Sequence, residues 1–207
     1  MAQKGYTTKE DIENYILSDI DSSFDDQIDE WIEAVENIID KMTNRNFIAD
    51  TEATARLFDG DGSEKLIIDE AVEITKVEVG NDDYGASFSE VSASGAGRYF
   101  LEPSNFTVRN LPVYMVTLRS QVFVCGKQNQ RITAKWGSFV AVPEDISFAA
   151  TVFVAGILNQ SRQGGDEIKS EKIGNYQVTY NTDKDGNSWA DFSRAMAILS
   201  VNKRILI

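Results

Sequence analysis

The sequence contains no histidine and only one cysteine, Cys125. These absences exclude an internal disulfide, zinc sites built from cysteine and histidine, histidine general bases and Ser-His-Asp triads. Cys125 follows the apolar run Val122–Val124, a pattern typical of a small buried strand residue, and no histidine is present to activate it as a nucleophile. Carboxylate-only catalysis, as in glycosidases, remains open because acidic residues are plentiful.

Long hydrophobic segments are also missing. The longest apolar stretch, from Phe148 to Leu158, is too short for a membrane-spanning helix, which needs about 20 apolar residues. The residues before Lys9 lack the apolar run of a signal peptide. We therefore expect a soluble protein that is made in a cytoplasm and has no membrane partner.

Positive charge is absent from one long segment. The net charge is -13, and nearly all of it lies between Glu10 and Asp40, a segment with twelve acidic residues and no lysine or arginine. Such a run is usually a solvated helix face. It also suits a surface that lies near DNA without binding it, because carboxylates repel phosphates. The residues assigned to this acidic surface are Asp25, Asp26, Asp29, Glu33 and Glu36.

Two helices are expected at the N-terminal end. Thr7 and Glu10 have the spacing of a capping box, and isoleucines then recur every four residues. A second helix is predicted from Ser22 to Arg45, because apolar residues follow at three- and four-residue spacing.

Two further helices are expected near the C-terminal end. Pro143 and the acidic residues after it are typical of a helix N-terminus. The stretch from Ile146 to Leu158 is apolar almost all round, which indicates a buried central helix. The last helix is predicted to begin at Ser188.

Between these helices the pattern changes to short β-rich runs separated by glycine, asparagine and proline turns. The predicted fold class is α+β: a bundle of two N-terminal, one central and one C-terminal helix, with an inserted antiparallel β domain and a long β-hairpin arm. The helical domain comprises residues 1–50 and 138–207, and the insert comprises 51–137. Besides the runs at 54–58 and 66–68, the expected strands are Val72–Val79, Arg98–Leu101, Phe106–Val108, Val113–Val124 and Arg131–Trp136.

The sequence pattern of residues 167–180 predicts the long β-hairpin arm, whose turn is expected at Gly174-Asn175. An isolated hairpin is marginally stable and exposes unpaired backbone groups along both edges. Two interpretations follow: the hairpin packs on the β domain of its own chain, or it is an arm that packs on a neighbouring protein. The residues assigned to the arm are Ile168, Lys169, Lys172, Ile173, Tyr176, Val178 and Tyr180.

The stretch FDGDGSEKLIIDE has acidic residues at positions 1, 3 and 12 of a calcium loop: Asp59, Asp61 and Glu70. Position 6, where an EF-hand needs glycine, is Glu64, and the flanking runs indicate strands instead of helices. Aspartate and glycine tolerate the positive φ of tight turns, so we favour a hairpin turn over a calcium site.

The order of the elements resembles a known family. The acidic N-terminal helix pair, Trp136-Gly137 followed by Val142–Ile146 and an alanine-rich helix, and the segment Ile168–Tyr180 resemble the small head-to-tail connector (adaptor) proteins of tailed bacteriophages. The resemblance covers the two helical ends of the chain and lies in the order and spacing of short motifs. The β-rich middle is longer than a minimal member needs.

The resemblance implies a structural protein that is not an enzyme and holds no cofactor or metal. Such proteins form rings, commonly of twelve copies, below the portal protein, extend the DNA channel and dock the tail. The implied partners are the portal, a tail or tail-completion protein, and passing double-stranded DNA that is not bound specifically. The implied location is the neck of the virion, and the host cytoplasm during assembly. A tail-completion or tail-terminator protein, and a calcium-binding module using Asp59, Asp61 and Glu70, stay open as alternatives.

Overall fold

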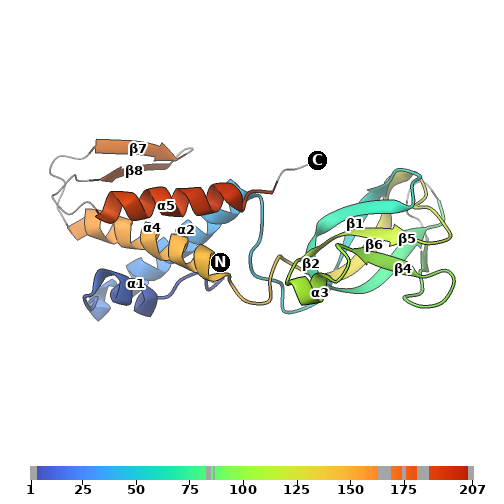
Figure 1. Cartoon of the computed structure of the whole chain (residues 1–207), viewed down its shortest axis with the longest axis horizontal. Helices are drawn as coiled ribbons and strands as arrows, with labels where there is room; N and C mark the ends of the chain where they lie inside the picture. Colours follow the sequence, from blue (N-terminus) through green and yellow to red (C-terminus); the bar gives the residue numbers. More distant parts are fainter. Residues whose placement is uncertain are drawn as a thin grey trace. The chain divides into compact units, whose positions relative to one another are not determined.

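The structure is a computed structural model that describes residues 4–82, 85, 87–162, 169–173, 176–180 and 187–204, with only the backbone between 163 and 190. Helices and antiparallel strands are both present, so the predicted α+β class is confirmed. The chain divides into a helical unit, residues 1–44 with 142–207, and a β unit, residues 45–141 (Figure 1). The division expected from sequence, with an insert at 51–137, differs by a few residues at each end.

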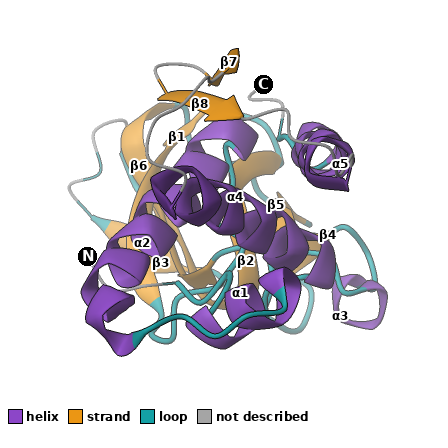
Figure 2. Ribbon diagram, turned by 90° about the vertical axis from the view of Figure 1, so that its left-hand side faces the viewer, coloured by secondary structure: helices purple, strands orange, loops and turns teal. Residues whose placement is uncertain are grey.

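The helical unit is built around its most apolar helix. Its elements are α1 (Lys9–Ile16), a short 3-10 turn (Ser22–Phe24), α2 (Asp25–Thr43), α4 (Glu144–Arg162) and α5 (Asn187–Val201). Helix α4 packs against α1, α2 and α5 (Figure 2). Nine of its residues are buried, which follows from the nearly all-round apolar sequence. The rings of Phe153 on α4 and Phe192 on α5 meet edge to face, with centroids 5.2 Å apart.

The capping box of helix α1 lies one residue later than predicted, at Thr8 and Asp11. The side chain of Thr8 accepts the backbone N–H of Asp11, and the carboxylate of Asp11 accepts the backbone N–H of Thr8. The predicted cap, Thr7, is buried instead, and its hydroxyl lies 2.7 Å from that of Thr151 on α4. Thr7 therefore belongs to the core, where its hydroxyl has a polar partner.

The β unit contains one six-stranded antiparallel sheet. The strands are β1 (Thr54–Gly60), β2 (Lys65–Gly80), β3 (Phe88–Glu90), β4 (Tyr99–Glu102), β5 (Val113–Leu118) and β6 (Gly126–Trp136). Their order is β1-β6-β2-β5-β4, and β3 pairs with β2. The first part of β2 pairs with β5 and the second part with β6, and register shifts near Ala71 and Ile74 mark the change. The buried side chains of these strands, including Trp136 and Ile132, form the core of the unit.

Several sequence expectations for the β unit are wrong in detail. Strands β1 and β2 do not form a hairpin, because β6 lies between them; the Asp-Gly turn only connects them. Residues 106–108 are not a strand: they lie in the short helix α3 (Phe106–Arg109). Strand β5 ends at Leu118, and the expected runs at 66–68 and Val72–Val79 are parts of one strand, β2. Cys125 is exposed, not buried.

The hairpin is present as a two-stranded antiparallel sheet of its own. Strand β7 (Lys169–Ile173) pairs with β8 (Tyr176–Tyr180) in a register that places Ile173 opposite Tyr176. Strand β8 contacts α4. Ile168 and the predicted turn residues Gly174-Asn175 lie outside the described residues.

Within the described ranges, none of the helices combines the length and the apolar character that a bilayer crossing requires.

Candidate functional site

The acidic surface lies at the start of α2. Asp25, Asp26 and Asp29 are exposed, and Glu33 is half-buried. Asp25 and Asp26 occupy the first helical turn, where carboxylates interact favourably with the helix dipole. The ammonium group of Lys9 lies 2.5 Å from a carboxylate oxygen of Asp25. All five predicted residues lie on α2, and four of them are at least partly exposed.

Glu36 does not belong to this surface, which corrects the sequence assignment. It is only 1% exposed, and its two carboxylate oxygens accept the backbone N–H groups of Lys4 at 2.7 Å and Tyr6 at 2.9 Å. Glu36 therefore anchors the N-terminal segment on α2. Its position could be found in the sequence, because it lies four residues after Ile32 and three before Ile39, on the apolar stripe of the helix.

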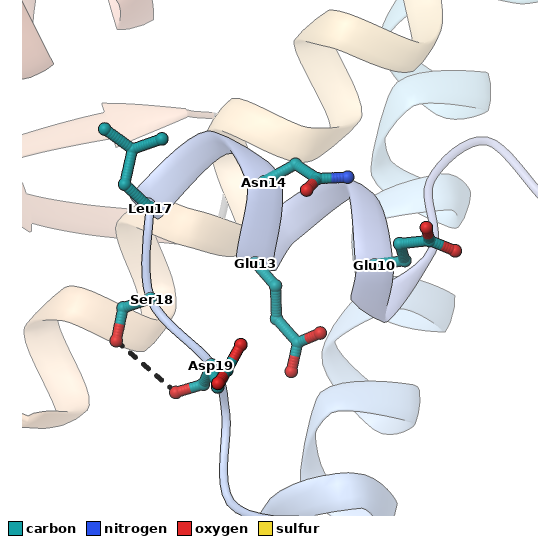
Figure 3. A pocket seen from close by; sticks show the side chains of 6 residues that line it. All are labelled: Glu10, Glu13, Asn14, Leu17, Ser18 and Asp19. Atoms are coloured by element: carbon teal, nitrogen blue, oxygen red, sulfur yellow. Dashed lines mark hydrogen bonds between the residues drawn. The ribbon is translucent and has the colours of Figure 1, made fainter.

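A second acidic feature, an open hollow at the C-terminal end of α1, was not found by sequence reasoning (Figure 3). Leu17 lies at its edge in the left-handed conformation and is 90% exposed. One carboxylate oxygen of Glu13 accepts the backbone N–H of Ile20 at 2.8 Å, which fixes the turn after the helix. The hollow is lined by Glu10, Glu13, Asn14, Leu17, Ser18 and Asp19.

The carboxylates of the calcium-loop candidate have separate protein partners. Asp59 accepts hydrogen bonds from the ammonium group of Lys127 at 2.6 Å and from the backbone N–H of Gln128 at 2.8 Å. The bond from Lys127 is the main reason that the pKa of Asp59 lies below its ordinary value.

The other two acids of that loop are held elsewhere. Asp61 accepts the backbone N–H of Ser63 at 2.8 Å, as in a tight turn. Glu70 accepts from Arg45 at 3.0 Å and from the hydroxyl of Ser138. In the part of the chain that the structure describes, no three acidic or cysteine side chains are grouped so that they could hold a metal ion. Only residues 61–64 of the stretch are a connection, between β1 and β2, and nothing in the geometry of the described residues favours the calcium interpretation.

For the residues of the predicted arm, the structure describes the backbone and the strand pairing. In the hairpin register Lys169 lies opposite Tyr180, and Lys172 lies opposite Gln177. The hairpin and the acidic surface are both in the helical unit, on β7, β8 and α2.

No protein-family model matches the sequence, and no curated protein is similar to it. Solved structures do match. A chain from a structure described as the neck of an empty GTA (gene transfer agent) particle, computed with C6 symmetry, aligns with a TM-score of 0.55 at 11% identity. A chain from the neck of a native GTA particle, computed with C12 symmetry, aligns with a TM-score of 0.54 at 11% identity. Both alignments cover 100% of this chain and 94% of the other. The similarity is one of fold.

Proposed function

We propose that this chain is a structural head-to-tail connector (adaptor) subunit of a tailed phage or phage-like particle. Twelve copies form a ring below the portal protein, extend the DNA channel and dock the tail. The observation that carries the proposal is the fold similarity to two neck chains, which extends over both units of this chain and nearly the whole of each neck chain. The symmetries stated for those necks support a ring of identical copies.

The charge distribution supports a place beside passing DNA. Exposed carboxylates at the start of α2 repel phosphates, and a channel works better if its wall does not bind the genome. In this role Asp25, Asp26, Asp29 and Glu33 face the channel, whereas Glu36 has a purely structural part.

The hairpin supports a role in assembly. Strands β7 and β8 form a separate two-stranded sheet, and such a ribbon needs a neighbour to cover its edges. We propose that residues 167–180 are the assembly arm, which packs on an adjacent subunit or on the portal. Tyr176, Val178 and Tyr180 supply its large side chains. The chain is then a virion protein rather than an enzyme, present in the host cytoplasm until it assembles.

The experiment is to produce particles without this chain. A missing connector leaves DNA-filled heads without tails and free tails of normal length, and supplying the chain restores attachment. If the chain is a tail terminator, its loss leaves overlong tails, because a stacked tube without an end cap keeps growing. Normal tailed particles would contradict both functions.

A further inference from the structure

A basic face lies at one corner of the β-unit sheet. Lys65 on β2 is opposite Thr117 on β5, which in turn is opposite Phe100 on β4. One residue pair beyond the last β4–β5 pair, the backbone N–H of Arg119 donates to the carbonyl of Arg98 at 3.2 Å. Because side chains alternate along strands, Arg98 and Arg119 lie on the same face as Phe100 and Lys65.

This arrangement groups positive charge around an exposed ring. The guanidinium of Arg98 lies 4.7 Å from the centroid of the Phe100 ring, and Phe100 is 42% exposed. Ile67, two residues after Lys65 on the same strand, is also exposed. Arginine and aromatic side chains together are typical of the energetically important parts of interfaces. We call Lys65, Arg98, Phe100 and Arg119 the basic face.

The cations of the basic face differ in their ion pairing from most of the other lysines and arginines in the β unit. Six described cations of this unit are ion-paired within the unit: Arg45, Arg56, Lys76, Lys127, Arg131 and Lys135. Among the described residues, Lys65, Arg98 and Arg119 form no ion pair. The carboxylate of Glu102 on β4 is not paired with any of these three cations; it accepts a hydrogen bond from the hydroxyl of Thr117 at 2.6 Å. The basic face therefore has charge available for a partner.

The acidic hollow of the helical unit has the opposite character. Glu10 and Asp19 are exposed and form no ion pair with a described residue. Leu17, which lines the same hollow at the other end of α1 from Glu10 (Figure 3), is almost fully exposed. The ammonium group of Lys9 lies 3.8 Å from Glu13 and closer still to Asp25. Negative charge next to an exposed apolar side chain complements positive charge next to an exposed ring.

The symmetry of a ring requires such a pair of surfaces. In a cyclic ring of more than two copies, each contact joins two different patches, so every copy must present both a patch and its complement. A basic face placed against another basic face would repel, which disfavours a two-fold dimer through this surface.

We propose that the basic face of one copy docks on the acidic hollow of the next copy in the ring, with Arg98 and Arg119 near Glu10 and Asp19, and Phe100 against Leu17. The existence of the ring rests on the proposed function. The contact joins the β unit of one copy to the helical unit of its neighbour.

The test uses two charge-reversed forms of the full chain. One carries Arg98→Glu and Arg119→Glu, and the other carries Glu10→Arg and Asp19→Arg; Glu13 is kept because it holds the turn. Self-association is measured by sedimentation velocity at low salt across a wide concentration range. We expect the unaltered chain to associate, with weakening at high salt, and each reversed form alone to lose at least about tenfold in association constant.

An equimolar mixture of the two forms distinguishes this contact from misfolding of the variants and from a contact within a single chain. Each reversed surface then meets an oppositely charged one on the other form, so association recovers. Misfolded variants, or a contact within a single chain, would not recover on mixing. The matched control is Arg109→Glu, an exposed arginine on α3 away from the basic face, which leaves association unchanged.

Three results would overturn the inference: an unaltered chain that stays monomeric at all concentrations, reversed forms that associate normally, or a mixture that does not recover. None of these results would decide the proposed function, which is tested by tail attachment in particles. Tail attachment does not depend on which surfaces form the ring.

Discussion

The buried carboxylate of Glu36 accepts the backbone N–H of Tyr6 at 2.9 Å, so a residue of the acidic segment holds the N-terminal segment in place. Tyr6 is itself fully buried, and its hydroxyl donates to Asp40 at 2.5 Å. The acidic segment therefore has two roles, because its exposed carboxylates set the surface charge while Glu36 stabilises the fold.

We predict that Glu36→Ala lowers the free energy of unfolding of the helical unit by about 2 kcal/mol, because the backbone N–H groups of Lys4 and Tyr6 lose their acceptors. Hydrogen exchange at the Tyr6 amide should become faster in parallel. The control is Glu30→Ala on the exposed side of the same helix, which should leave both quantities unchanged. Equal effects of the two substitutions would show that the Glu36 bonds do not stabilise the fold.

A second prediction concerns Glu78 on β2, which accepts two hydrogen bonds of 2.7 Å from the guanidinium of Arg131 and lies 2.9 Å from the ammonium group of Lys76. The bonds from Arg131 are the main cause that lowers the pKa of Glu78 from 4.5 to about 2. A carboxyl whose pKa is lower in the folded state stabilises the fold above its unfolded pKa. That stabilisation is lost as the pH falls from about 4.5 towards 2.

We therefore expect Glu78→Gln to destabilise the β unit at pH 7 by about 1–2 kcal/mol, and by progressively less as the pH falls towards 2. Unfolding by urea can be followed by the fluorescence of Trp136, with Trp31 and Trp189 replaced by phenylalanine. Glu73→Gln, which removes an exposed pair with Lys135, serves as the control and should have no measurable effect. A difference between wild type and Glu78→Gln that does not change with pH would contradict the assignment.

The exposed acids of α2 lead to a prediction about DNA. Fluorescence anisotropy with labelled duplex should detect no binding of the isolated chain near physiological salt, because binding requires neutralisation of backbone phosphates. Replacing Asp25, Asp26 and Asp29 by lysine should produce weak, salt-sensitive binding. Tight binding by the unaltered chain would rule out the channel-wall role of this surface.

The hairpin prediction uses a deletion. Replacing residues 168–180 by a short glycine linker should leave a folded, soluble chain that no longer joins the portal complex, because the deletion removes the contact that we propose the hairpin makes with a neighbour. Circular dichroism checks folding, and co-purification with portal rings measures assembly.

In the matched control for that deletion, the exposed loop Ser92–Gly97 of the β unit is replaced by a short glycine linker. This change should leave assembly on the portal intact. If the chain without the hairpin occupies portals normally, the interface must lie on the helices.

Local patterns in the sequence predict the helices well but not the strand pairing. Helix α4 was predictable because its apolar residues leave no polar face. The position of β6 between β1 and β2 depends on contacts such as Leu57 opposite Arg131, which join residues far apart in the chain. A three-residue run such as 106–108 carries too little pattern to separate a strand from a short helix.

The same limit applies to the candidate surfaces. The acidic surface could be predicted because its residues are close in sequence. The helical spacing of Ile32, Glu36 and Ile39 also indicates that Glu36 is buried. The basic face was not visible, because Arg98 and Arg119 become neighbours only when β4 pairs with β5.

The most direct test of the connector function is cryo-electron microscopy of complete particles, with a reconstruction of the neck. We expect twelve copies of this two-unit chain in a ring directly below the portal, with α2 of each copy towards the DNA channel. A neck without this chain, or copies located only at the far end of the tail, would contradict the connector function.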